Sequence, residues 1–143
     1  MNNTPYAFDF AFATRLLAGN SHFELDVHCQ SRARRLAIIG PSGAGKSLIL
    51  QLLAGLLRPQ SGHVRINGHN LGDTASGYWP PQQQRQAGLV FQDYALFPHL
   101  TVAQNIAFGL KPGLQNPPHT ADALTRQWLE RMQLQAVAAH YPA

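Results

Sequence analysis

An octapeptide of mostly small residues, Gly-Pro-Ser-Gly-Ala-Gly-Lys-Ser at residues 40–47, interrupts the most apolar part of this chain. It follows the apolar run at residues 36–39 and opens a leucine-rich segment at residues 46–57. The octapeptide matches the pattern G-x-x-x-x-G-K-[ST] at every fixed position, and it lies between a predicted strand and a predicted helix, as that pattern requires. An accidental match in a glycine-rich turn is the alternative, and the flanking segments argue against it. The octapeptide therefore predicts a phosphate-binding loop.

Each residue type in this loop suits that chemistry. Glycines let the backbone curl so that successive N–H groups face phosphate oxygens, and the N-terminus of the following helix adds a partial positive charge. We expect the Lys46 ammonium to reach the β- and γ-phosphates and the Ser47 hydroxyl to bind Mg²⁺. The candidate binding residues are Gly40, Pro41, Ser42, Gly43, Ala44, Gly45, Lys46, Ser47 and Leu48.

A second candidate is Gln92, in the segment Val-Phe-Gln-Asp-Tyr-Ala-Leu-Phe-Pro-His that begins at residue 90. Gln92 ends a predicted buried strand at residues 87–92, and open parallel sheets place their ligand groups at such strand ends. Its amide could orient the metal ion or the attacking water. We therefore take Ser47 and Gln92 as metal candidates, and Lys46 and Gln92 as catalytic candidates. The alternative for Gln92 is a polar cap on a strand end.

Apolar patterning predicts a sheet with helices. Alternation at residues 6–13 and 23–29, with turn residues between them, predicts an antiparallel pair of strands. Continuous apolar runs at residues 36–39 and 87–92 predict strands buried on both faces of a parallel sheet. Leucines cover nearly every face of the helix that begins at Lys46, so we expect that helix to be enclosed. The order of these elements indicates an α/β fold with a β-rich N-terminal part.

The middle of the chain carries a turn signal. Residues 63–70 predict a short strand that runs into a turn at Asn67 and Gly68. Residues 70–86, which are rich in glycine, proline and glutamine, predict a loop.

Two helices are predicted in the last third of the chain. The first covers residues 100–110 with Thr101 near its N-cap, and the second covers residues 120–137 with Thr120 as its cap. Helical spacing predicts that the second helix turns Leu124, Trp128 and Met132 into the core.

The composition limits the partners. Charged residues make up 13% of the chain, about half the usual share, and the net charge is +4. The one dense basic cluster, Arg32, Arg34 and Arg35, has no interleaved aromatic residues, so we expect no nucleic-acid partner. The seven histidines lack the spacing of a metal site, which leaves Mg²⁺ as the expected metal. No signal peptide or membrane span is predicted, which favours a cytoplasmic chain.

With these motifs in place, the chain resembles the ATPases of ATP-binding-cassette (ABC) transporters. Residues 40–47 resemble the Walker A motif, and the segment from Val90 to Leu110 resembles the Q-loop and the helix after it. More narrowly, residues 20–143 are similar to the ATPase subunits of bacterial molybdate importers, including the excursion at residues 74–85. The resemblance implies a P-loop NTPase (RecA-like) core with an N-terminal antiparallel β subdomain and part of the helical subdomain.

The resemblance also implies a function. Two such subunits would sandwich two ATP molecules with Mg²⁺ and couple ATP hydrolysis to import through membrane permease subunits, at the cytoplasmic face of the plasma membrane. Molybdate is the favoured solute, with sulfate and iron importers as alternatives. The residues expected to dock on the permease are Tyr94, Leu96, Phe97 and Pro98, and local core packing is the alternative for them. The aromatic residue that stacks on adenine stays open among Tyr6, Phe10 and Phe12.

Other motifs of the family are missing from these 143 residues. They contain no LSGGQ signature, no Walker B strand ending in Asp-Glu and no switch histidine beyond it. Residues 1–143 therefore resemble an incomplete nucleotide-binding domain, and we expect negligible ATPase activity from them alone. A truncated, non-hydrolysing interaction module is an alternative; a kinase or GTPase would need a base or switch loop that the sequence does not show.

Overall fold

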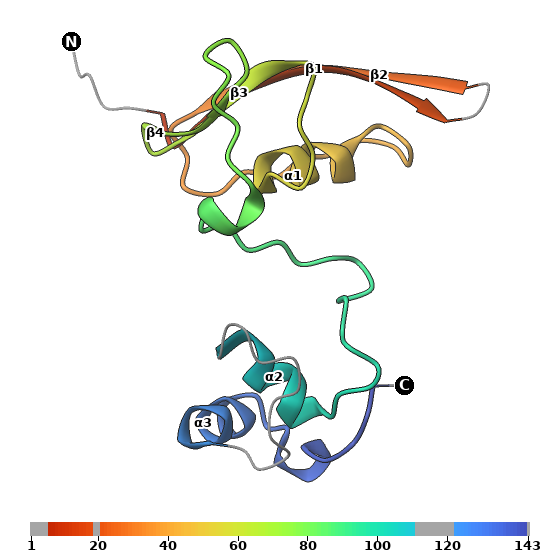
Figure 1. The fold of residues 1–143 in the computed structure, drawn as a ribbon, viewed down its shortest axis with the longest axis vertical. Coiled ribbons are helices and arrows are strands. Elements are labelled where there is room, and N and C mark those ends of the chain that lie inside the picture. Colours follow the sequence, from red (N-terminus) through yellow and green to blue (C-terminus); the bar gives the residue numbers. More distant parts are fainter. Residues whose placement is uncertain (1–5, 19–20, 111–121, 143) are drawn as a thin grey trace. The chain divides into compact units, whose positions relative to one another are not determined.

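The computed structural model describes residues 6–18, 21–110 and 122–142, in two compact units that meet in sequence between Leu89 and Val90 (Figure 1). The first unit contains a sheet and a helix, and the second contains short helices. None of the helices in these described ranges is long and apolar enough to cross a membrane.

The first unit is built on a four-stranded antiparallel sheet of order β2-β1-β3-β4. Strand β1 (Phe8–Ala18) pairs along its whole length with β2 (Ser21–Ser31), which confirms the predicted antiparallel pair and lengthens both strands. Strand β3 (Ser61–Ile66) pairs with the other edge of β1, and β4 (His69–Asp73) pairs with β3.

The turn between β3 and β4 confirms the signal at Asn67 and Gly68. Both residues have positive φ, 50° and 79°, as a two-residue type I′ hairpin turn requires. The predicted loop at residues 70–86 is wrong at its start, because β4 continues to Asp73. This strand is mostly polar and contains Gly72, so no apolar alternation marks it in the sequence; its pairing with β3 forms it.

Helix α1 (Lys46–Ala54) packs on one face of this sheet (Figure 1). Phe10 and Phe12 alternate inward along β1, their rings stack with centroids 5.4 Å apart, and they meet Ile49 and Leu52 of the helix. The buried cluster comprises Phe10, Phe12, Leu25, Ile49, Leu52 and Val64.

The expectation that α1 would be enclosed is wrong among the described residues. Leu50 is 44% exposed, and Leu56 and Leu57, just beyond the helix, are also exposed. The helix ends at Ala54 because Gly55 adopts the left-handed conformation, with φ 79°, that closes many helices. The sheet thus covers one face of α1 and leaves part of its apolar surface open.

The two predicted parallel strands at residues 36–39 and 87–92 are also wrong: neither segment is a strand. Ile39 is 92% exposed and Val90 is 81% exposed. A parallel strand exists only where a neighbour accepts and donates its backbone hydrogen bonds. Every strand among the described residues belongs to the antiparallel sheet, so these segments have no such neighbour. A short 3₁₀ helix, η1 (Gln82–Gln84), precedes the second of them.

The second unit begins with a loop and helix α2 (Val102–Leu110). Thr101 caps this helix as predicted: the Gln104 N–H donates to the Thr101 hydroxyl at 3.3 Å, and the Thr101 N–H donates to the Gln104 side chain at 2.9 Å. These two bonds form a reciprocal capping box. Residues 138 and 140 add backbone acceptors for the N–H groups of Ala103 and Val102, at 2.9 Å each.

Helix α3 (Ala123–Arg131) departs from prediction in its cap and its buried face. The N-cap is Asp122, whose carboxylate accepts from the Thr125 N–H at 2.8 Å; the predicted cap, Thr120, lies outside the described residues. The buried residues are Thr125 and Leu129, whereas Leu124 and Met132 are 47% and 56% exposed and Trp128 is half-buried. The predicted core face of α3 is therefore wrong. The 3₁₀ helix η2 (Gln135–Val137) follows α3.

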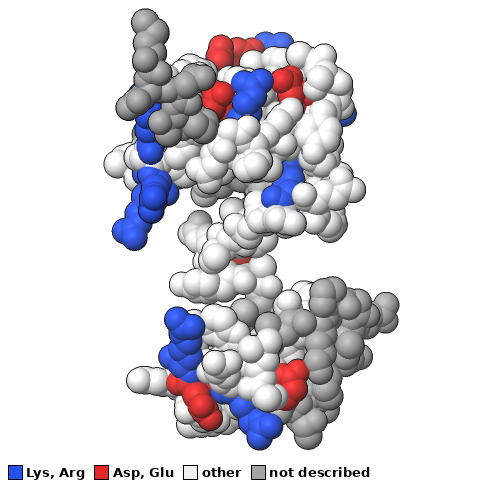
Figure 2. Space-filling model, turned by 90° about the vertical axis from the view of Figure 1, so that its left-hand side faces the viewer, with Lys and Arg blue, Asp and Glu red and all other residues white. Residues whose placement is uncertain are grey.

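The sheet face away from α1 carries a charged network centred on Asp9. Its cross-strand neighbours are Gln30 on β2 and Arg65 on β3, which donate to the carboxylate at 3.2 and 3.3 Å. His63 lies 3.1 Å away, and Arg65 also bonds Asp73. Basic and acidic groups are accordingly mixed over this unit in Figure 2. Burial alone would raise the pKa of Asp9, but the hydrogen bonds from His63, Gln30 and Arg65 outweigh it and lower that pKa below its usual value.

This network predicts a pH dependence of stability. Because the folded-state pKa of Asp9 is depressed, its contribution is present above the unfolded-state pKa and is lost as the pH falls through the folded-state value. Asp9→Asn should cost about 1–2 kcal/mol near pH 7, since it removes a charge that accepts several hydrogen bonds. Urea titrations between pH 7 and pH 3 should show a smaller loss of stability for the variant than for the wild type. Parallel losses in both proteins would contradict the assignment.

Candidate functional site

The segment that the sequence singles out, the 40–47 loop, leads directly into α1. Gly43 and Gly45 adopt left-handed backbone conformations with φ of 80° and 85°, and Gly45 is the N-cap of the helix. L-residues with a Cβ rarely adopt these angles, so the two glycines allow the loop to curl back on itself. The Ala44 N–H donates to the Pro41 carbonyl at 3.3 Å inside this curl.

Strand β2 packs against the loop at Gly45. A Cβ on Gly45 would lie 2.9 Å from Cζ of Phe23 and 3.2 Å from Cδ1 of Leu25, closer than side chains normally pack. Gly45 therefore satisfies two constraints, a left-handed backbone and a close approach to β2. Around Gly43, in contrast, a Cβ would meet no atom within 4 Å, which leaves open space beside the loop.

The charged group of the loop is Lys46. Its ammonium donates to the carbonyl oxygens of Gly40 and Pro41 at 2.9 and 2.6 Å, so the side chain folds back over the loop. Residues 40–48 include no Asp or Glu that would compete with an anion for this ammonium. The Ser47 hydroxyl is on an exposed residue next to it.

The start of α1 adds unpaired backbone donors. The first intrahelical bond runs from the Ile49 N–H to the Gly45 carbonyl at 2.9 Å, and the N–H groups before it have no partner within the helix. The first turn contains no acidic side chain. The positive end of the helix dipole and the Lys46 ammonium thus lie together, which is the arrangement that binds phosphate.

Lys46 and Ser47 also line a cavity of about 420 Å³. The rest of its wall is apolar and comes from the start of β1, the segment before the loop and the outer side of α1. These residues are Phe8, Leu36, Ile38, Leu50 and Leu53. The volume lies within the range of small-molecule sites, and Lys46 and Ser47 are the polar residues of a lining that is otherwise apolar.

The aromatic residues that the sequence left open for adenine are not equivalent in the structure. Phe10 and Phe12 are 2% and 1% exposed and belong to the core, so neither is free to stack on a base. Tyr6 is half-buried, and the Arg32 guanidinium lies 4.9 Å from its ring centroid.

Gln92 belongs to the second unit and is exposed there. The structure describes that unit separately from the 40–47 loop, so the joint action of Gln92 with Lys46 and Ser47 stays a prediction.

The residues proposed to dock on a permease are all exposed in the second unit; Tyr94 is 73% and Leu96 is 53% exposed. Asn105 of α2 fixes the backbone of Phe97 through bonds of 2.9 and 3.2 Å. The Phe97 ring lies 4.4 Å from that of Phe108. This segment is therefore held in place while its apolar side chains stay on the surface, against the alternative of core packing for Leu96.

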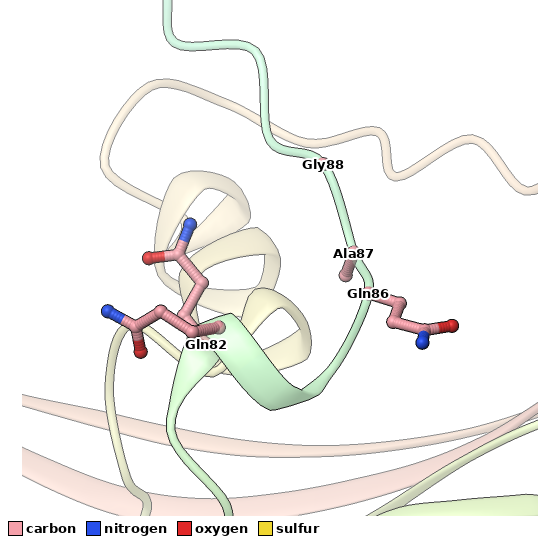
Figure 3. Close-up of a pocket in the computed structure, with 5 residues that line it drawn as sticks. Gln82, Gln86, Ala87 and Gly88 are labelled. Carbon is pink, nitrogen blue, oxygen red and sulfur yellow. The ribbon is translucent and has the colours of Figure 1, made fainter. Parts of the chain in front are cut away.

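A further hollow of about 420 Å³ lies beside η1 in the first unit (Figure 3). Its lining residues are Gln82, Gln83, Gln86, Ala87 and Gly88. Gln82 and Gln86 point away from one another, and the lining carries no charge (Figure 3). Among the described residues, no group of three or more His, Cys, Asp or Glu could hold a metal ion. The 40–47 loop is thus the stronger site.

The sequence reasoning missed the residues that support this loop. The sequence predicts only that Phe23 and Leu25 belong to a strand, although the alternation along that strand already places both on one face. The contact of Phe23 with Gly45 forms only when β2 packs against the loop in the tertiary structure.

Comparison with known proteins finds relatives among import ATP-binding proteins. The chain is 41% identical over 87 residues to the molybdenum import ATP-binding protein ModC of Mesorhizobium japonicum, which covers 61% of this chain and 24% of the relative. It is 40% identical over 122 residues to the sulfate/thiosulfate import ATP-binding protein CysA of Nephroselmis olivacea, covering 85% and 33%. Further relatives are named as iron(III) and thiamine import ATP-binding proteins. The chain thus spans about a third or less of the length of the curated relatives it matches.

A solved structure shares the fold. It is an ATP-binding cassette dimer in a post-hydrolysis state bound to ADP and Pi, with a TM-score of 0.63, 22% sequence identity, and coverage of 94% of this chain and 61% of that one. This likeness confirms an α/β P-loop NTPase fold, of which the antiparallel part is formed in the described residues. The ABC transporter family model matches residues 24–142, and the chain therefore belongs to the ABC transporter family.

Proposed function

We propose that the 40–47 loop binds the β- and γ-phosphates of ATP and that Ser47 contributes a hydroxyl to the accompanying Mg²⁺. The observation that carries this proposal is the convergence of the Lys46 ammonium, the left-handed glycines and the first turn of α1, with no acidic residue among them. The open space at Gly43 leaves room for a phosphate against the backbone.

Nucleotide binding would require a rearrangement of the Lys46 side chain. The Lys46 ammonium now donates to two loop carbonyls, and it would exchange at least one of these bonds for a phosphate oxygen. A hydrogen bond from the ammonium to an anionic phosphate oxygen joins two opposite charges, so it is stronger than a bond from the same ammonium to a neutral carbonyl. The exchange is therefore favourable. Bound Mg²⁺ would neutralise phosphate charge, and with no carboxylate cluster in the described residues its ligands would be phosphate oxygens, the Ser47 hydroxyl and water.

At the level of the whole protein, we propose an ATP-binding subunit of a bacterial importer. Two copies would enclose two ATP molecules, with Gln92 sensing the nucleotide and with Tyr94, Leu96, Phe97 and Pro98 docking on a permease at the cytoplasmic face of the membrane. Family membership and the relatives' names support import. Molybdate is our proposed solute, supported by the ModC relative and by the excursion at residues 74–85.

The nucleotide-binding proposal is tested at Lys46. Lys46→Ala should raise the Kd for a fluorescent ATP analogue at least about tenfold, because it removes the charge that meets the phosphates. Arg34→Ala, a change at an exposed arginine outside the loop, serves as the matched control and should leave the Kd within about twofold. Equal affinity of the wild type and Lys46→Ala would sink the proposal.

Hydrolysis should behave differently from binding. A polypeptide of these 143 residues should release no phosphate from ATP, because it supplies no Asp-Glu pair to hold the metal ion and orient the attacking water. A colorimetric phosphate assay measures this, and turnover near 1 s⁻¹, about the lower end for phosphoryl-transfer enzymes, would show the expectation to be wrong.

The solute is tested in cells. Disruption of the gene that encodes this chain should reduce uptake of radiolabelled molybdate while iron and thiamine uptake continue. Loss of sulfate uptake with molybdate uptake intact would instead favour the sulfate alternative.

A further inference from the structure

Arg85 is a buried charge without a carboxylate partner. The residue is 3% exposed, and none of the ion pairs among the described residues includes it. Burial lowers the pKa of its guanidinium, an effect that Tyr78 opposes. A buried arginine that stays charged costs free energy unless its N–H donors find acceptors. The groups that accept from Arg85 therefore show which parts of the fold it holds together.

Nε and Nη1 find backbone carbonyls, two of which lie at the end of α1, whereas Nη2 is buried without a hydrogen-bond partner. Nη1 of Arg85 lies 3.3 Å from the carbonyl oxygens of both Leu52 and Leu53, and Nε donates to the Pro80 carbonyl at 3.2 Å. The last carbonyls of a helix carry partial negative charge, and the Leu52 carbonyl accepts from the Gly55 N–H at 3.1 Å as well as from Arg85. The guanidinium therefore caps the C-terminal end of α1 and joins it to the chain segment just before η1.

Trp79 completes the enclosure of the guanidinium. Its ring centroid lies 4.4 Å from Cζ of Arg85, and its indole N–H donates to the Leu57 carbonyl at 3.2 Å. Trp79 thus covers the charge with a ring face and makes a second bond to the segment that follows α1. Such cation–π contacts strengthen when they are buried.

Two glycines make room for this arrangement. A Cβ on Gly55 would overlap Nε of Arg85, and a Cβ on Gly72 would lie 2.7 Å from Cε3 of Trp79 and 3.0 Å from Nη2 of Arg85. Four residues from α1's end, β4 and the segment that follows β4 thus meet at one point. We call the set of Gly55, Gly72, Trp79 and Arg85 the arginine clamp.

We propose that Arg85 is a positioning residue for the nucleotide: the arginine clamp fixes the C-terminal end of α1, and with it the direction of the helix whose N-terminal end carries Lys46 and Ser47. The inference rests on the proposed ATP binding by the 40–47 loop. A nine-residue helix is about 13 Å long, so a tilt of about 5° about one end moves the other by about 1 Å. The sheet covers only one face of α1, and the clamp adds a restraint against such a tilt at the C-terminal end of the helix.

The test uses the full chain and two readouts. Arg85→Met keeps the length of the side chain but removes the charge and the donors. Amide hydrogen exchange without nucleotide should then accelerate at least about tenfold at residues 43–50, far from the substitution, with little change in β1. The Kd for the fluorescent ATP analogue should rise about tenfold.

Three further variants separate positioning from general stability. Arg58→Met, at an exposed arginine just beyond α1, should change neither readout. Phe12→Leu, at a core position on β1 that pairs with Val27 and Gly62 and with no clamp residue, should lower the free energy of unfolding but keep the Kd within about twofold. Arg85→Lys keeps the charge without the planar fork, and it should shift both readouts in the same direction by a smaller factor. It also provides the test if Arg85→Met does not fold.

Each outcome decides a different question. Wild-type exchange rates at residues 43–50 in Arg85→Met or Arg85→Lys would overturn the inference, as would an acceleration spread equally over the sheet strands. If the wild type binds no nucleotide, the proposed function fails, and the exchange readout alone still decides whether the clamp orients α1.

Discussion

The burial of Ile49 and Leu52 of α1 against the sheet is the contact on which the rest of the first unit depends. Their partners Phe10, Phe12 and Val64 are almost fully buried, and each such side chain contributes about 1.5–3 kcal/mol. By comparison, a single hydrogen bond in the 40–47 loop contributes about 1 kcal/mol. Packing of α1 therefore places the loop, and the polar contacts of Lys46 refine its shape.

The two ends of α1 are held by different chemistry. At the N-terminal end, Gly45 lies against Phe23 and leaves backbone N–H groups free for an anion. At the C-terminal end, the Arg85 guanidinium meets the carbonyls of Leu52 and Leu53. A cation at the negative end and a proposed anion at the positive end both complement the helix dipole. The helix is thus suited to carry a phosphate loop on one face of a small sheet.

Local signals predicted the local features of this chain. The Asn67-Gly68 turn, the β1–β2 pair and the Thr101 cap each depend on a few neighbouring residues, and all three are confirmed. The runs at residues 36–39 and 87–92 mark apolar segments correctly, yet they form no strands, because strand formation requires a neighbour that the pattern cannot supply. Helical spacing predicts the wrong buried face of α3, because Leu124, Trp128 and Met132 follow that spacing just as Thr125 and Leu129 do.

The sequence by itself determined the kind of site: a glycine-rich loop with Lys46 and Ser47 at the start of a helix, because backbone freedom and charge are properties of residue types. Only the tertiary structure decided what holds that site. Phe10 and Phe12 are buried in the core, which excludes them as stacking partners for adenine. Phe23 of β2 packs against Gly45. The tertiary structure also brought Arg85 to the end of α1, 33 residues from Leu52 in sequence. Contacts at such separations depend on the whole packing, which no local pattern encodes.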